Sequence, residues 1–100
     1  MIRHIVAWNY KVGFSQEENR ENAQKVKYEL EALKDCISGI IEFEVIIDPL
    51  DTSNRDVVLD SLFESEKALA DYQVHPEHKR VSAFVGSVLQ DRVCIDYYEK

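Results

Sequence analysis

Cysteine, proline and glycine are all scarce in this chain, which has two cysteines, two prolines and three glycines among 100 residues. Cys36 and Cys94 show no C-x-x-C spacing, so a cysteine-based metal or redox motif is not expected. The chain opens on strand-like sequence instead of a charged segment followed by an apolar signal core. We therefore expect a cytoplasmic protein, with Cys94 in the core of its last strand.

An excess of positive charge and long apolar runs are also missing. Twelve lysines and arginines face nineteen acidic residues, which gives a formal net charge of -7, and no basic run interrupts this balance. Nucleic acid and anionic membrane surfaces are therefore not expected as partners. No apolar stretch approaches the roughly 20 residues that cross a bilayer. The length suits one small domain over residues 1–100, for which dimerisation would be a natural source of further buried surface.

The first half of the chain predicts a strand followed by a long helix. Residues alternate from Ile2 to Tyr10, with His4 on the more apolar side of the predicted strand. The segment from Ser15 to Glu18 has the pattern of a capping box, and apolar residues then recur at three- and four-residue spacing. This helix should end before Gly39.

The second half predicts a hairpin, two helical segments and a final strand. Residues 40–47 and 56–63 are rich in β-branched and large apolar types, and the turn-forming residues 48–54 separate them. Ser65 can cap a helix through Val74, a further helical turn starts at Pro76, and residues 88–98 again favour a strand. The order β-α-β-β-α-β indicates a ferredoxin-like α+β fold with an antiparallel four-stranded sheet.

Both faces of the predicted sheet are partly apolar. Along residues 40–47, Ile41 is expected beside Phe43 on one face and Ile40 on the other. One face can take the helices, and the other should hold four acidic residues among apolar ones, namely Glu42, Glu44, Asp60 and Asp96. Such a mixed surface predicts a homodimer through the sheet face, in which these acids form salt bridges with lysine or arginine rather than hold a cation.

The segment from Tyr72 to His78 gathers a tyrosine, two of the three histidines and a proline around one helix break. Pro76 lacks an N–H and suits the first position of a helix, which places His78 in its first turn. The positive end of the helix dipole disfavours imidazolium there, so we expect His78 to be neutral near physiological pH. Helical spacing puts His78 on the same face as Val85, directed toward the interior.

The same residues have an equally simple structural interpretation. Histidines and tyrosines at helix junctions often cap backbone groups or fill space, and His75 and Tyr72 could satisfy backbone groups in this way. No metal site is predicted, because a helix break separates His75 from His78 and no carboxylate has a fixed place beside them.

Four segments together resemble the stress-responsive A/B barrel domain family, the dimeric α+β barrels. They are residues 2–6, residues 63–65, residues 72–78 and residues 93–97. The resemblance covers nearly the whole chain. It implies a homodimer whose two sheets face one another as a barrel, with the helices outside and a small pocket between sheet and helices in each subunit.

The resemblance also implies roles for three residues. The family includes plant polyketide cyclases of the olivetolic acid type, which close a linear poly-β-keto chain by an aldol step without metal or organic cofactor. Carried over by local motif, His78 would be the general base and acid, and Tyr72 would orient or polarise a substrate carbonyl. His4 would be a pocket histidine on the first strand.

Four further residues are expected to contact a substrate. They are His75, Val57, Val6 and Trp8. Val57 is a departure from the cyclase pattern, because the position we align with it carries another histidine in those enzymes. The resemblance therefore implies a more apolar ligand or the loss of one polar contact.

Three functions remain open at this point. The first is a cofactor-free enzyme or binder for a small carbonyl-bearing molecule, in which His78 removes a proton and Tyr72 stabilises the enolate. The second is a non-enzymatic stress-response or assembly protein. The third is a monooxygenase of the haem-degrading or antibiotic-biosynthesis kind, with His78 as axial ligand and Asn9 as polar partner. Trp8 and Asn9 are strand neighbours that point to opposite faces, which disfavours the third function.

Overall fold

Four strands and three helices follow one another in the predicted order. The computed structural model describes all residues 1–100. The elements are β1 (Ile2–Tyr10), α1 (Gln16–Cys36), β2 (Ile40–Ile46), β3 (Val57–Phe63), α2 (Glu66–Val74), α3 (Pro76–Val88) and β4 (Leu89–Tyr98). The second connection holds a full helix, α3, where the sequence indicated only an extra turn.

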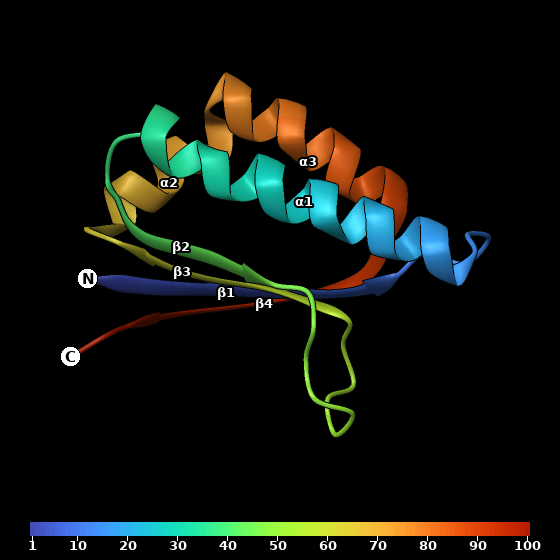
Figure 1. The fold of residues 1–100 in the computed structure, drawn as a ribbon. Helices are drawn as coiled ribbons and strands as arrows, with labels where there is room; N and C mark the ends of the chain where they lie inside the picture. The colour runs from blue at the N-terminus through green and yellow to red at the C-terminus, as the bar shows by residue number, and fades with distance from the viewer.

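The strands form one antiparallel sheet in the order β2-β3-β1-β4, which confirms the ferredoxin-like α+β fold. All three helices cover the same face of this sheet, and the other face is open (Figure 1). β4 is an edge strand beside β1, so the two chain ends lie together and the Glu99 amide donates to the Met1 carbonyl at 3.0 Å. None of the helices combines the length and the apolar character that crossing a bilayer requires.

Local signals account for the helix boundaries. In the capping box of α1, the Glu18 amide donates to Ser15 Oγ and the Ser15 amide donates to the Glu18 carboxylate. After α1 the chain turns at Gly39, whose φ of +90° suits glycine. A Cβ at Gly39 would lie 2.6 Å from Ala68 Cβ, so the close approach of this turn to α2 also requires glycine.

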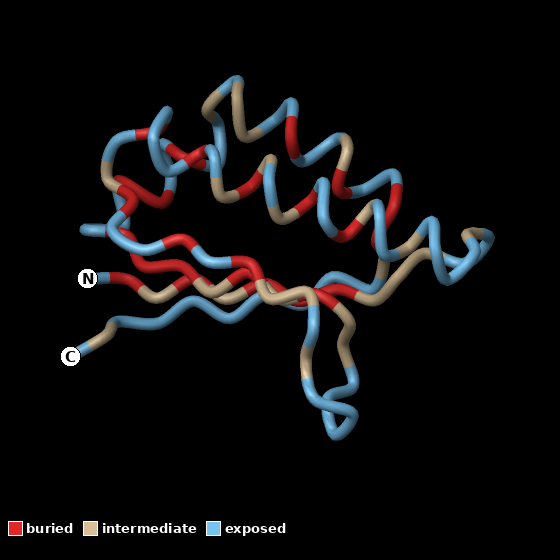
Figure 2. The backbone as a smooth tube through the Cα atoms, in the orientation of Figure 1, coloured by how far each residue is buried: buried red, intermediate tan, exposed pale blue.

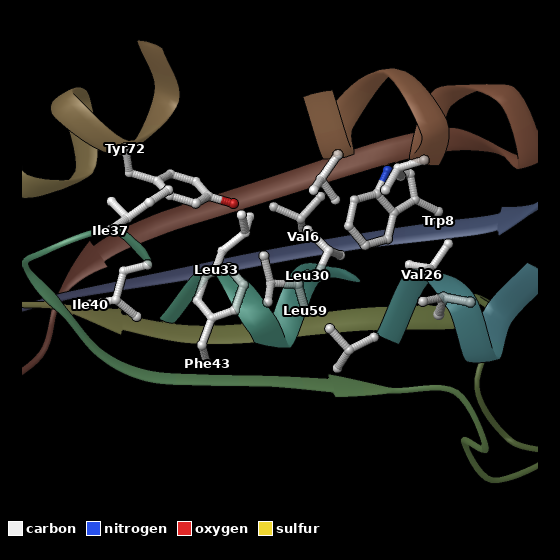
Figure 3. Close-up of a cluster of buried hydrophobic side chains, with 14 of the residues drawn as sticks. Val6, Trp8, Val26, Leu30, Leu33, Ile37, Ile40, Phe43, Leu59 and Tyr72 are labelled. Atoms are coloured by element: carbon white, nitrogen blue, oxygen red, sulfur yellow. The ribbon is translucent and has the colours of Figure 1, made fainter. Parts of the chain in front are cut away.

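The core lies between the sheet and the helices (Figure 2). Each helix contributes an apolar stripe, and β1, β2 and β3 contribute their helix-facing side chains. Phe63, Val45, Val26 and Val57 have no exposed surface at all. Figure 3 shows the Tyr72 ring projecting from α2 into this layer among the aliphatic side chains.

The expected strand faces need two corrections. A register shift between Ile40 and Glu42 puts Ile40 in the core and leaves Ile41 exposed, the reverse of simple alternation. Asp96 pairs with His4 across β4 and β1, so it lies on the helix-facing side instead of the open face. Figure 2 shows that β4 is exposed along most of its length, and Cys94 is accordingly exposed instead of buried.

Candidate functional site

A cavity of about 300 Å³ lies between the sheet and α3. Its polar wall consists of His4, Tyr72, His78, Ser82 and Arg92, and its apolar wall includes Val6, Trp8, Leu30, Leu59, Val85 and Leu89. A small pocket with apolar walls and a few convergent polar groups is the usual form of a small-molecule site. A larger hollow of about 850 Å³ at the start of α1 contains no histidine, so it offers less for acid/base chemistry.

His78 enters the pocket from the first turn of α3, as the sequence predicted. Its ring is half-buried and lies 4.3 Å from the Tyr72 ring, centroid to centroid, while His78 Nδ1 lies 3.3 Å from the Gln73 carbonyl oxygen. Burial lowers the pKa of His78, the hydrogen bond with the Gln73 carbonyl opposes this, and the positive charge of Arg92 adds to the lowering. The direction matches the expected neutral imidazole, but burial is the main cause.

Tyr72 reaches the pocket from the last turns of α2 and is 1% exposed. Its ring packs against Phe63 at 5.0 Å, Phe43 at 5.7 Å and His4 at 6.2 Å between centroids. Burial raises the pKa of the phenol, so Tyr72 keeps its proton and can donate a hydrogen bond. Figure 3 shows the hydroxyl pointing along the core toward Val6.

His4 forms the floor of the pocket on β1 and is 2% exposed. His4 Nδ1 lies 2.5 Å from Asp96 Oδ1, and the Ser61 hydroxyl donates to the His4 carbonyl at 2.6 Å. Because a carboxylate only accepts hydrogen bonds, this contact places the imidazole proton on Nδ1. In the neutral ring, Nε2 is then the acceptor.

Cys94 joins His4 and Asp96 in a cluster whose ligand atoms lie within 4.8 Å of one another. Cys94 Sγ is 3.8 Å from His4 Nδ1 and 3.6 Å from Asp96 Oδ1. Burial raises the pKa of the Cys94 thiol, and the charge of Asp96 adds to this effect. A transition metal accepts such a donor set. In the structure, however, His4 Nδ1 and the Asp96 carboxylate bind each other, and this contact orients the His4 ring.

The structure brings together most, but not all, of the residues expected at the site. Val6 and Trp8 line the pocket beside the polar residues. His75 lies outside the lining and caps α3, with its Nδ1 accepting from the Glu77 amide at 3.1 Å. Val57 is fully buried outside the lining, and Leu59, two residues further along the same face of β3, occupies the pocket wall.

Two polar residues of the site have no counterpart among the expected ones. Arg92 lines the pocket from β4, and Asp96 binds His4 from the same strand. Either could have been found only from the register of β4 against β1, which the sequence does not specify. Asn9 lies away from the pocket and donates to Asp91 at 3.2 Å, as its position on the opposite face to Trp8 indicated.

The family model of the stress responsive A/B barrel domain matches residues 2–99. The chain belongs to the stress responsive A/B barrel domain family. This confirms the resemblance seen in the sequence. No curated protein matches this stress responsive A/B barrel domain significantly.

Solved structures share its fold over nearly the whole chain. A dimeric protein of ferredoxin-like fold from Bacteroides fragilis is 26% identical, with a TM-score of 0.89 over 98% of this chain and 95% of its own. A dabb family protein from Mesorhizobium loti is 24% identical, with a TM-score of 0.71 over 99% and 96%. A hydroxynitrile lyase from Passiflora edulis is 16% identical, with a TM-score of 0.81 over 99% and 93%. The similarity to the Mesorhizobium loti and Passiflora edulis proteins, both under 25% identical, shows only that the fold is shared.

Proposed function

We propose that this stress responsive A/B barrel domain binds a small carbonyl-bearing organic molecule in the pocket and acts on it by cofactor-free acid/base chemistry. The observation that carries the proposal is the packing of the His78 ring against the Tyr72 ring, with 4.3 Å between centroids and a tilt of 48°, beside apolar walls. Burial lowers the pKa of the imidazole and raises that of the phenol. The pair therefore combines a neutral base with a protonated donor.

The chemistry follows from these two protonation states. Neutral His78 takes a proton from a carbon next to the substrate carbonyl, and the C–H electron pair moves into the enolate. Tyr72 donates a hydrogen bond to the oxygen on which the negative charge develops. The imidazolium then returns the proton to the same carbon or to a product of its reaction. His4, oriented by Asp96, offers Nε2 as an acceptor for a substrate hydroxyl.

One similar structure bears on the proposal. The Passiflora edulis protein is a lyase, so this fold can carry an enzyme active site. At 16% identity it transfers no residue role to the present chain. The argument for acid/base chemistry therefore depends on the pocket itself.

The non-enzymatic alternative also has an observation in its favour. Tyr72 is almost completely enclosed, and its ring packs against Phe63 and Phe43 as a core aromatic does. On that interpretation the Tyr72–His78 contact only holds the junction of α2 and α3 on the sheet. The two functions differ in one measurable respect, because only the first requires the pocket to admit a ligand.

Exchange of the α-proton of a 2-alkyl-3-oxo ester in D2O tests the proposed function. Proton NMR follows the loss of the α-proton signal with and without protein. Exchange that is faster than in imidazole buffer and saturates with ester concentration supports a binding site with a base. Exchange equal to that in the buffer contradicts the proposal.

We propose in addition that the protein is a homodimer through the open face of its sheet. This face carries apolar side chains on β4, with Ile95 60%, Tyr97 46% and Val93 43% exposed in the single chain. Arg3 on the same face binds Asp60 and Glu42 at 3.0 Å each, as expected for the acidic residues there. A partly apolar surface with internally paired charges is suited to a second copy, and the Bacteroides fragilis relative is dimeric.

The substitution Ile95→Glu should convert the dimer to a monomer. It places a carboxylate at an apolar position of the proposed interface, where it would lose water without gaining a partner. Light scattering coupled to gel filtration at micromolar concentration measures the mass. Val12→Glu is the matched control, because Val12 is 82% exposed in the turn after β1 and the charge change is identical. An Ile95→Glu variant with the mass of the wild-type dimer would rule out this interface.

The cysteines bear on localisation. Cys36 and Cys94 are both free thiols. Free thiols are typical of a reducing compartment. We therefore retain the cytoplasm, expected from the sequence, as the proposed location.

A further inference from the structure

We propose that the natural ligand of the pocket is an oxo acid, whose carboxylate is bound by Arg92 while its carbonyl lies at Tyr72 and His78. This proposal rests on the proposed function and specifies its substrate class. Arg92 belongs to none of the sequence motifs, and it lines the pocket from β4.

The pocket is positively charged in an otherwise acidic protein. The chain has nineteen acidic residues and a net charge of -7, but no carboxylate is in the pocket wall and Arg92 is its only formal charge. Most of the remaining wall is apolar. Arg92 is exposed and belongs to a wall that is otherwise mostly apolar, so the pocket offers an anion a positive partner despite the sign of the whole protein.

Arg92 reaches the pocket at a β-bulge, on the same face of β4 as Cys94 and Asp96. The pairing of β4 with β1 shifts between Ala7 and Asn9, so both Asp91 and Arg92 fall opposite Trp8. Asp91 has a φ of 58°, and its carboxylate accepts a hydrogen bond from the Asn9 side chain at 3.2 Å. Bulges of this kind change the direction of side chains next to binding sites. Here Asp91 binds Asn9, which lies away from the pocket, and Arg92 lines the pocket together with Trp8.

The Arg92 guanidinium is available to a ligand. The ion pairs of the chain involve Arg3, Lys27, Lys67 and Arg80, together with His4, and none involves Arg92. The positive charge of Arg92 also acts on the reacting pair, since it opposes the burial that raises the pKa of Tyr72 and adds to the lowering of the pKa of His78. Arg92, Tyr72 and His78 line the same cavity of about 300 Å³, so one molecule can meet Arg92 at one end and Tyr72 at the other.

The size of the cavity and the chemistry of arginine define the ligand class. A guanidinium binds a planar carboxylate through two parallel hydrogen bonds. A cavity of about 300 Å³ is at the small end of ligand pockets, so carboxylate and carbonyl belong to one compact molecule. The apolar wall formed by Val6, Trp8 and Leu59 accommodates the hydrocarbon part.

Binding of a matched acid and ester tests this inference. The probes are 4-oxo-4-phenylbutanoate and its methyl ester, which share the ketone and the ring and differ in the charge. Isothermal titration calorimetry measures the affinities, and fluorescence of Trp8, the single tryptophan, reports that the probe occupies this pocket. We expect the wild type to bind the acid about tenfold more tightly than the ester or better, as for a hydrogen-bonded charge pair.

The variant Arg92→Gln should abolish this preference, because it weakens binding of the acid far more than binding of the ester. Arg80→Gln is the matched control, because Arg80 is an exposed arginine of α3 that pairs with Glu77 and Glu29, and its loss should keep the preference for the acid. Equal affinity of the wild type for acid and ester, or a preference that survives Arg92→Gln, overturns the role of Arg92 while the proposed pocket function stands. Failure of both probes to bind or to change Trp8 fluorescence contradicts the inference and the proposed function together.

Discussion

Replacing His78 by asparagine should slow protein-dependent α-proton exchange of the oxo ester by about 10² to 10⁴, the range that a positioned general base contributes. Asparagine fills a similar volume but cannot take up a proton at neutral pH. Neutral His78 is the active form, so the wild-type rate should rise with pH and level off once its lowered pKa is passed. Proton NMR in D2O over a pH series measures both the rate and its plateau.

The control for this variant is His75→Asn. His75 belongs to the same helix junction but lies outside the pocket, and asparagine preserves its capping of the Glu77 amide. Exchange in this variant should match the wild type. Should His78→Asn fold normally and retain the wild-type rate, His78 is not the base, and the structural interpretation of the Tyr72–His78 contact is the better one.

Replacing Phe63 by alanine should lower the free energy of unfolding by about 3–5 kcal/mol, the cost of truncating a fully buried phenylalanine. Phe63 has no exposed surface, and its ring packs edge-on or tilted against Tyr72 at 5.0 Å, His4 at 5.9 Å and Phe43 at 6.3 Å. A loss of this size is a large share of the stability of a small domain. Urea unfolding at a fixed protein concentration measures it.

Phe84→Ala provides the comparison. Phe84 is only partly buried on α3, with the Lys25 ammonium 4.4 Å above its ring, so the same truncation should cost clearly less. The expected result is a Phe63→Ala midpoint well below that of Phe84→Ala. Equal midpoints would mean that the aromatic cluster under Tyr72 does not support the pocket as described.

Local chemistry explains why much of the fold could be predicted from the sequence. The Ser15–Glu18 capping box and Pro76 act within one helical turn, so their partners are a few residues away in the chain. Alternation along β1 placed His4 and Trp8 on the core side for the same reason. Pro76 placed His78 in the first turn of α3, and the helical spacing between His78 and the buried Val85 directed its side chain toward the sheet.

The remaining parts depend on contacts between distant segments. The bulge at Ile40 reversed the faces of Ile40 and Ile41, and the register of β4 against β1 placed Asp96 beside His4 and Arg92 in the pocket. No residue type in the sequence indicates either register shift. Leu59 lines the pocket instead of Val57, two residues away on the same face of β3, and this difference depends on tertiary packing.

Low pH should reduce the free energy of unfolding because of His78. The folded pKa of His78 lies below its ordinary value of 6.5. Between these two values the unfolded chain binds a proton that the folded chain does not, so stability from this group is complete above about 6.5 and falls as the pH drops through that window.

An NMR pH titration of the His78 imidazole in the intact protein tests the central claim most directly, with the signal assigned by its absence from His78→Asn. The account predicts a midpoint below 6.5, which means a neutral base that is still open to solvent at physiological pH. A midpoint at or above 6.5 would contradict it, because the folded protein would then not disfavour the protonated form of His78. So would a ring that does not titrate until the protein unfolds, because such a histidine is a closed part of the core.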